Sequence, residues 1–105
     1  MTNRHSSNKS IVLIVEDEPL IRMFAVIIVE EAGFEVLEAG NADEAVLILE
    51  SRLDIRIIFT DIDMPGSMDG LKLSIFVRDR WPPVRIIVTS VKRSLPGRGL
   101  LLPKP

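Results

Sequence analysis

The sequence predicts an α/β domain built on a parallel sheet. Short apolar runs alternate with longer segments in which apolar residues recur at helical spacing, the pattern of repeated strand–helix units. Two of the runs, IVLIV at 11–15 and the centre of RIIVT at 85–89, are continuously apolar and show no alternation with polar residues. Strands covered on both faces lose polar alternation, which is typical of parallel sheets between helices. The 105 residues suffice for one domain with a single core.

The first strand, at 11–15, is followed by a helix expected to begin near Pro19, a residue suited to a first helical turn. Gly33 is expected just past the end of this helix, because glycine readily adopts the left-handed conformation found there. A second strand is expected within 34–39. The apolar positions at helical spacing in the first helix are Leu20, Met23, Phe24, Ile27 and Ile28.

N-cap residues and prolines predict where the remaining helices begin and end. Asn41 and Asp69 are expected to cap the second and third helices, since both residue types accept hydrogen bonds from the free N–H groups at a helix start. The third helix must stop before Pro82-Pro83. Further strands are expected at 55–60, at 84–90 and, as a short fifth strand, in GLLLP at 99–103. Residues 1–10 are expected to form a disordered polar tail, and 11–105 the domain.

Composition excludes several classes of protein. The chain has no cysteine, so disulfides and thiolate metal sites are excluded. Its net charge of -2 gives no general attraction to nucleic acid or to an anionic membrane surface. The N-terminal stretch has no apolar signal region, and no run is long enough to span a membrane. We therefore expect a cytoplasmic protein without direct nucleic-acid or membrane binding.

Polar residues follow four of the predicted strands. Glu16 and Asp17 come after the first strand, Asp61 ends the third, Thr89 ends the fourth and Lys104 follows the fifth. In a parallel α/β sheet the carboxyl ends of the strands meet at one edge, where ligands bind. These side chains are therefore expected to lie together.

The expected group suits a divalent ion and a phosphoryl group. Like charges at about 4 Å repel by roughly 4 kcal/mol in a medium of effective dielectric near 20, so the repulsion among Glu16, Asp17 and Asp61 must be offset by raised pKa values, a cation or both. Oxygen ligands favour Mg²⁺, and with no cysteine and a single histidine nothing favours zinc. Lys104 adds a positive charge, and the Thr89 hydroxyl can donate a hydrogen bond to an anionic oxygen. An aspartate such as Asp61 can itself be the nucleophile that forms an acyl phosphate.

Each residue also has a simpler interpretation. In the acidic cluster after the first strand, Glu18 with Pro19 could serve only the start of the next helix. Asp61 could only form a turn, and Thr89 could be an ordinary strand residue. The order of all these groups along the chain, each at the end of a strand, favours the phosphoryl site.

The sequence resembles the receiver domain of two-component response regulators from about Ile11 to Pro105. VLIVEDEP resembles the acidic motif of the family's first strand, and IIFTDIDMPGSMDGLKL resembles its phospho-acceptor motif. RIIVTS and LPKP resemble the remaining two signatures. The resemblance implies a flavodoxin-like, doubly wound parallel sheet of five strands in the order 2-1-3-4-5.

The resemblance also implies a role for each matched residue. Asp61 would be phosphorylated by a partner histidine kinase or phosphotransfer protein and would ligate Mg²⁺. Glu16, Asp17 and the backbone carbonyl of Asp63 would complete the metal site, and Thr89 and Lys104 would bind the phosphoryl group. The domain would then be a signalling module with output through protein contacts, limited as a catalyst to its own phosphotransfer and dephosphorylation.

The sequence departs from the family at three places. The loop MPGSMDG is one residue longer than usual, the fourth helix is shortened to one turn at most, and Leu101 replaces the aromatic switch residue. The sequence stops where the family has a final helix, so that helix is expected to be missing; part of the sheet is then expected to be uncovered and to favour a homodimer. Two alternatives remain: a haloacid-dehalogenase-like phosphatase, in which Asp63 is the general acid/base, and a pseudo-receiver that binds without phosphorylation.

Overall fold

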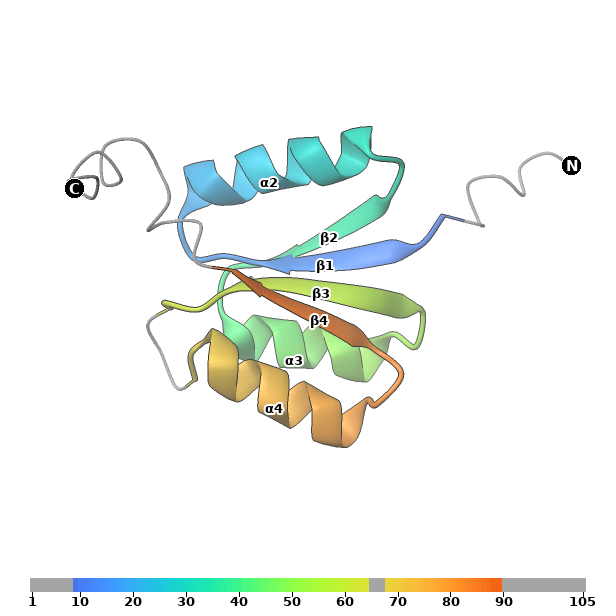
Figure 1. Ribbon diagram of the computed structural model, residues 1–105, viewed down its shortest axis with the longest axis vertical. Helices are drawn as coiled ribbons and strands as arrows, with labels where there is room; N and C mark the ends of the chain where they lie inside the picture. Colours follow the sequence, from blue (N-terminus) through green and yellow to red (C-terminus); the bar gives the residue numbers. More distant parts are fainter. Residues whose placement is uncertain (1–8, 65–67, 90–105) are drawn as a thin grey trace, which may run out of the picture.

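The computed structural model describes residues 9–64 and 68–89, which form a four-stranded sheet and three helices. The strands are β1 (Ile11–Val15), β2 (Glu35–Ala39), β3 (Ile55–Asp61) and β4 (Arg85–Thr89). The helices are α2 (Pro19–Glu31), α3 (Ala42–Ser51) and α4 (Gly70–Arg80). Helices and strands alternate along the chain, and α2 covers one side of the sheet while α3 and α4 cover the other (Figure 1).

The strand order is β2-β1-β3-β4, and every neighbouring pair is parallel. The predicted α/β class and the first four places of the predicted order are confirmed. The predicted fifth strand, the shortened helix before it and residues 1–8 of the tail lie outside the described residues. Within the described ranges, no helix is both long and apolar enough to cross a membrane.

The helix boundaries follow the predicted caps. The Asn41 side chain accepts a hydrogen bond from the Glu44 N–H at 2.8 Å, and the Asp69 side chain accepts one from the Lys72 N–H at 2.9 Å. Gly33 has φ +101°, the left-handed conformation expected just after the end of α2. Local chemistry therefore sets where these helices begin and end.

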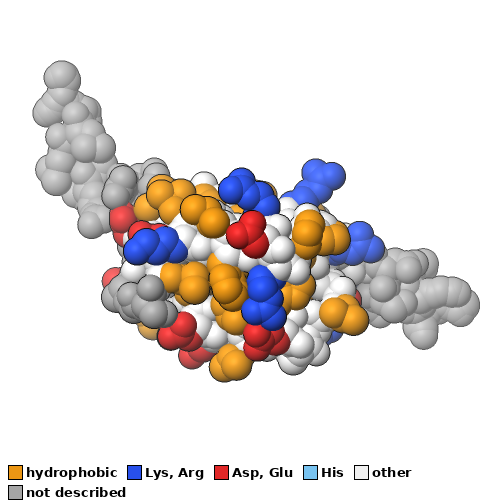
Figure 2. All heavy atoms as spheres, turned by 90° about the horizontal axis from the view of Figure 1, so that it is seen from below, with side chains coloured by type: hydrophobic (Ala, Val, Ile, Leu, Met, Phe, Trp, Pro, Cys, Tyr) orange, Lys and Arg blue, Asp and Glu red, His pale blue; other side chains and the backbone are white. Residues whose placement is uncertain are grey.

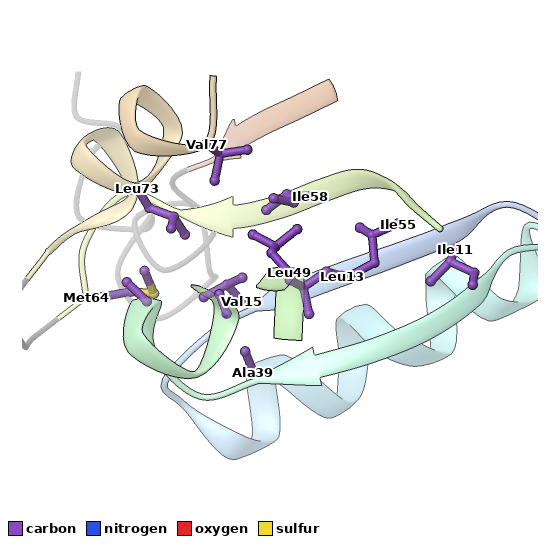
Figure 3. Close-up of a cluster of buried hydrophobic side chains, with 12 residues drawn as sticks. Ile11, Leu13, Val15, Ala39, Leu49, Ile55, Ile58, Met64, Leu73 and Val77 are labelled. Atoms are coloured by element: carbon purple, nitrogen blue, oxygen red, sulfur yellow. The ribbon is translucent and has the colours of Figure 1, made fainter. Parts of the chain in front are cut away.

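The main hydrophobic core lies between the sheet and the α3–α4 layer. Leu13 of β1 and Ile58 of β3 are paired in the sheet, and both are fully buried. Leu49 of α3 and Leu73 and Val77 of α4 pack into the same cluster, which Figure 3 shows in close-up. This packing fixes α3 and α4 against one face of the sheet.

The two most apolar strands differ in burial. Every residue of β1 is buried, as predicted for a strand covered on both faces. In β4, however, Arg85 is exposed and Ile87 is 47% exposed. The prediction that RIIVT is covered on both faces is therefore wrong for the described part of the chain, because α2 lies over β1 and β2 and leaves β4 open on that side.

Helix α2 forms where the apolar periodicity predicted it, yet none of its residues is buried. By contrast, α3 and α4 each bury three residues. The five apolar positions at helical spacing are 45–74% exposed: Leu20, Met23, Phe24, Ile27 and Ile28. In the described structure, the stripe that predicted the helix faces outward.

Replacing Leu73 with alanine tests the core assignment. Leu73 is fully buried, so Leu73→Ala should lower the free energy of unfolding by about 2–5 kcal/mol through lost burial and the cavity left behind. The matched control is Leu71→Ala on the same helix, where the side chain is 51% exposed and the loss should stay below about 1 kcal/mol. Urea unfolding measures both, and equal losses would contradict the assignment.

Candidate functional site

Asp61 and Thr89 lie side by side at the carboxyl edge of the sheet. They are the last residues of β3 and β4 and are partners in the strand register. The Ile62 N–H donates to the Thr89 carbonyl at 2.8 Å, which continues the pairing one step past Asp61. Asp61 is only 2% exposed. A buried aspartate with a threonine as its register partner is thus a feature of this edge.

The acidic loop after β1 lies on the other side of Asp61. Val15 pairs with Thr60, so Glu16 and Asp17 follow β1 at the level where β3 ends. Glu16 is 4% exposed, and its Oε2 accepts a hydrogen bond from the Glu18 N–H at 2.8 Å. Glu18 is the N-cap residue of α2, although its side chain makes no capping hydrogen bond, so this bond ties the Glu16 carboxylate to the helix start.

Arg22 holds this loop in place. Its Nη1 donates to the Glu16 carbonyl at 2.7 Å, and its Nε pairs with Glu38 Oε1 of β2 at 3.2 Å. One guanidinium therefore joins α2, the acidic loop and β2. Sequence reasoning missed this residue, because one arginine on a helix carries no pattern that marks such a contact.

Gly70 allows α4 to approach the backbone that follows Asp61. A Cβ atom placed on Gly70 would lie 2.0 Å from the Asp61 carbonyl oxygen. The Gly70 N–H donates to the Ile62 carbonyl at 3.0 Å. The Asp-Gly pair predicted the helix start, but the close approach that requires glycine was not visible in the sequence.

The chain beyond Asp61 is anchored by Met64. Met64 is 8% exposed and joins the hydrophobic core, and its sulfur lies 4.0 Å from the hydroxyl oxygen of buried Thr60. Asp63, one residue earlier, is exposed. Anchoring on both sides fixes the course of the backbone at Asp63, whose carbonyl is the predicted metal ligand.

The donor chemistry of this edge suits Mg²⁺. Carboxylates and backbone carbonyls are the oxygen ligands that a hard cation prefers. Across the two described ranges, no three histidine, cysteine, aspartate or glutamate side chains gather closely enough to hold a metal ion. Mg²⁺ does not require such a group, because it keeps several waters and binds through one or two carboxylates plus phosphate oxygens.

Four of the predicted site residues lie at the same edge of the sheet: Glu16, Asp17, Asp61 and Thr89. Asp63 lies two residues beyond Asp61. Lys104 and Leu101 lie outside the described residues, as do residues 65–67 of the MPGSMDG loop. The roles assigned to all of these residues remain predictions.

Comparison with known proteins identifies the fold. Residues 12–99 match the model of the response regulator receiver domain. The chain is 40% identical over 80 residues to protein-glutamate methylesterase/protein-glutamine glutaminase 3 of Hahella chejuensis, a match covering 75% of this chain and 22% of that protein. The chain spans between 10% and 39% of the length of three curated relatives.

The solved structures similar to this chain include two that contain the response regulator TrrA. The response regulator TrrA of Thermotoga maritima in complex with Mg²⁺-BeF has a TM-score of 0.72 and 29% identity, covering 81% of this chain and 73% of that one. A structure of the histidine kinase ThkA in complex with TrrA has a TM-score of 0.69 and 32% identity, covering 75% and 66%.

Gly70→Ala tests the close approach of α4 to Asp61. The added methyl group would overlap the Asp61 carbonyl, so α4 must shift, and we expect a loss of unfolding free energy of about 1–3 kcal/mol. Gly40→Ala is the control, since its Cβ would meet only the ends of the Glu44 and Arg22 side chains at 3.3 and 3.4 Å. Chemical denaturation compares the two, and a harmless Gly70→Ala would refute the geometry.

Proposed function

The chain belongs to the receiver domain family of two-component systems, and we propose that it accepts a phosphoryl group on Asp61 from a histidine kinase or a phosphotransfer protein. The observation that carries the proposal is the buried Asp61 carboxylate at the end of β3, with Thr89 beside it and the Glu16–Asp17 loop on its other side. The complex of ThkA with TrrA, a similar protein, supports the choice of donor.

In the proposed reaction an Asp61 carboxylate oxygen attacks the phosphorus of a phosphohistidine. The new O–P bond forms as the N–P bond breaks, and the imidazole nitrogen leaves with the bonding electron pair. Transfer of this kind depends mainly on positioning and on neutralising the phosphoryl oxygens. Asp61 is held in position by the β3–β4 pairing and by the packing of Gly70 against its carbonyl.

The other residues bind the charged group. The predicted Mg²⁺ ligands are Asp61, Asp17, Glu16 and the Asp63 carbonyl, and we propose that one or two of the three carboxylates bind the ion directly while waters complete its shell. The ion would neutralise negative charge on the phosphoryl oxygens. The Thr89 hydroxyl would donate a hydrogen bond to one of these oxygens, and Lys104 would pair with another. The Mg²⁺-BeF complex of TrrA supports the assignment by similarity.

The proposal describes a signalling domain. It keeps the cytoplasmic location expected from the sequence and an output through protein contacts without direct nucleic-acid binding. A phosphatase of the haloacid-dehalogenase type would carry its Asp-x-Asp motif on the first strand, whereas Asp61 ends the third strand of this chain. That alternative therefore has no support from the fold.

Labelling with acetyl phosphate tests the acceptor. Intact-protein mass spectrometry after incubation with acetyl phosphate and Mg²⁺ should show a single added phosphoryl group, because one carboxylate is the nucleophile. Asp61→Asn should abolish the addition. The control Asp79→Asn, at an exposed position on α4, should label like the wild type.

Three results would contradict this proposal. Labelling that persists in Asp61→Asn would place the acceptor elsewhere. Absence of any labelling in a folded wild type would favour a pseudo-receiver. Repeated turnover of a generic phosphate ester would favour an enzyme.

Asp17→Asn tests the metal site. Removing one of the proposed carboxylate ligands should weaken Mg²⁺ binding by at least about tenfold, equivalent to roughly 1.4 kcal/mol, without changing the fold. Isothermal titration calorimetry measures the affinity, and circular dichroism checks the fold. The control is Asp43→Asn at an exposed position on α3. Unchanged Mg²⁺ affinity in Asp17→Asn would remove this residue from the site.

A further inference from the structure

Arg22 of α2 connects segments that are separate in the sequence. Its Nη1 donates to the Glu16 carbonyl at 2.7 Å, and its Nε donates to Glu38 Oε1 of β2 at 3.2 Å. A Cβ atom placed on Gly40, the residue that follows β2, would lie 3.4 Å from the same Nη1. The guanidinium therefore lies against the carboxyl end of β2 and reaches from there to the acidic loop.

The Glu16 carbonyl belongs to the peptide group that joins Glu16 to Asp17. A peptide group is planar and nearly rigid, so a hydrogen bond to its oxygen also restricts the position of the next Cα atom. The Glu16 N–H donates to the Ala39 carbonyl of β2 at 3.0 Å. Both backbone polar groups of Glu16 are thus tied to β2, the N–H directly and the carbonyl through Arg22 and Glu38.

This arrangement bears on metal binding because Asp17 is one of the predicted Mg²⁺ ligands. Mg²⁺ requires near-ideal octahedral geometry with ligands at about 2.0–2.1 Å. A carboxylate on a backbone that is already held in place loses less conformational entropy on binding than one on a mobile loop. The contacts of the Glu16 backbone use only groups of the chain itself, so they preorganise the residue that follows.

We propose that Arg22 is a positioning residue for the magnesium site, which acts by holding the Glu16–Asp17 peptide group in the orientation that metal binding needs. The inference rests on the proposed function, because it concerns the Mg²⁺ ligands named there. Glu38 is the anchor of Arg22 on β2. Arginine suits this role because its planar guanidinium presents donors in fixed directions, here Nη1 to one acceptor and Nε to another.

The charge of Arg22 acts against its positioning role. A guanidinium near the site repels Mg²⁺, and this repulsion is reduced because Glu38 pairs with it and because the two side chains are 24% and 52% exposed to screening solvent. Loss of the charge alone would tighten Mg²⁺ binding, whereas loss of the hydrogen bond to the Glu16 carbonyl would weaken it. The sign of the change in affinity therefore separates the two roles.

Arg80 and Glu50 provide a matched ion pair on the other side of the sheet. Arg80 Nη2 lies 3.4 Å from Glu50 Oε2, the side chains are 49% and 44% exposed, and the pair joins α4 to α3. Figure 2 shows this side of the molecule, where charged side chains lie among hydrophobic ones. Exposed ion pairs of this kind contribute little to stability. Removing Arg80 thus reproduces the loss of a surface pair without changing the acidic loop.

Isothermal titration calorimetry of the full chain with Mg²⁺ tests the proposal. Arg22→Met keeps a long side chain of good helix propensity but removes every donor. It should weaken Mg²⁺ binding by about tenfold, an effect typical of residues that orient metal ligands, even though it also removes a positive charge. Arg80→Met should bind like the wild type. Glu38→Ala should weaken binding less than Arg22→Met, and less again in the Arg22→Met background, because both residues belong to one hydrogen-bond network.

Amide hydrogen exchange without Mg²⁺ measures the positioning itself. The Glu18 N–H donates to Glu16 Oε2, so its protection reports how well the loop is held. This N–H should lose protection in Arg22→Met and keep it in Arg80→Met. The N–H of Ile58, a fully buried residue of β3, should exchange at the same rate in both variants and in the wild type, which shows that the fold is intact.

The two measurements separate this inference from the proposed function. If the wild type binds Mg²⁺ and Arg22→Met binds it equally or more tightly, the positioning role is refuted while the metal site stands. Unchanged protection of the Glu18 N–H in Arg22→Met would refute it too, as would an equal loss of protection in Arg80→Met. A folded wild type that binds no Mg²⁺ would overturn the proposed metal site and this inference together.

Discussion

The parallel pairing of β3 with β1 on one side and β4 on the other is the constraint from which the site follows. Val15 opposite Thr60 and Asp61 opposite Thr89 set the register, so the acidic loop, Asp61 and Thr89 end at the same level. The register is itself fixed by burial, because a slip of one residue would turn Leu13 and Ile58 out of the core. The geometry of the charged edge is thus a consequence of the packing on the apolar face.

The two sides of the sheet differ in how deeply their helices are buried. On the α3–α4 side, fully buried residues such as Leu49 and Val77 fill the core, while on the other side the whole of α2 remains at least partly exposed. Burial stabilises by roughly 25 cal/mol per Å² of apolar surface removed from water. Most of the folding stability of the described residues therefore comes from one side, and the other side retains apolar surface that a contact can still bury.

The sequence predicted the element order, the caps at Asn41 and Asp69 and the left-handed Gly33 because each of these depends on short-range chemistry. It predicted the edge that carries Asp61 because the carboxyl ends of all strands in a parallel sheet lie at the same edge. It failed where the result depends on what lies across the fold. Three features depend on residues that are distant in the sequence, and hydrophobic periodicity does not reveal such contacts. They are the exposure of Ile87, the hydrogen bond from Arg22 to the Glu16 carbonyl and the close approach at Gly70.

The acidic loop and the exposed apolar residues of α2 are joined through one structural element, the helix itself. Arg22 binds the Glu16 carbonyl at the site, and Leu20 and Phe24 on the same helix line an apolar hollow. Two binding events on one element influence each other only if one of them changes the free energy of a contact that the other uses, and the influence is then reciprocal. The Arg22–Glu16 hydrogen bond is such a contact, because it joins the helix to the loop and its side chain is 24% exposed. A contact that shifts α2 would therefore alter this hydrogen bond, and Arg22 gives such a contact a physical route to the acidic loop.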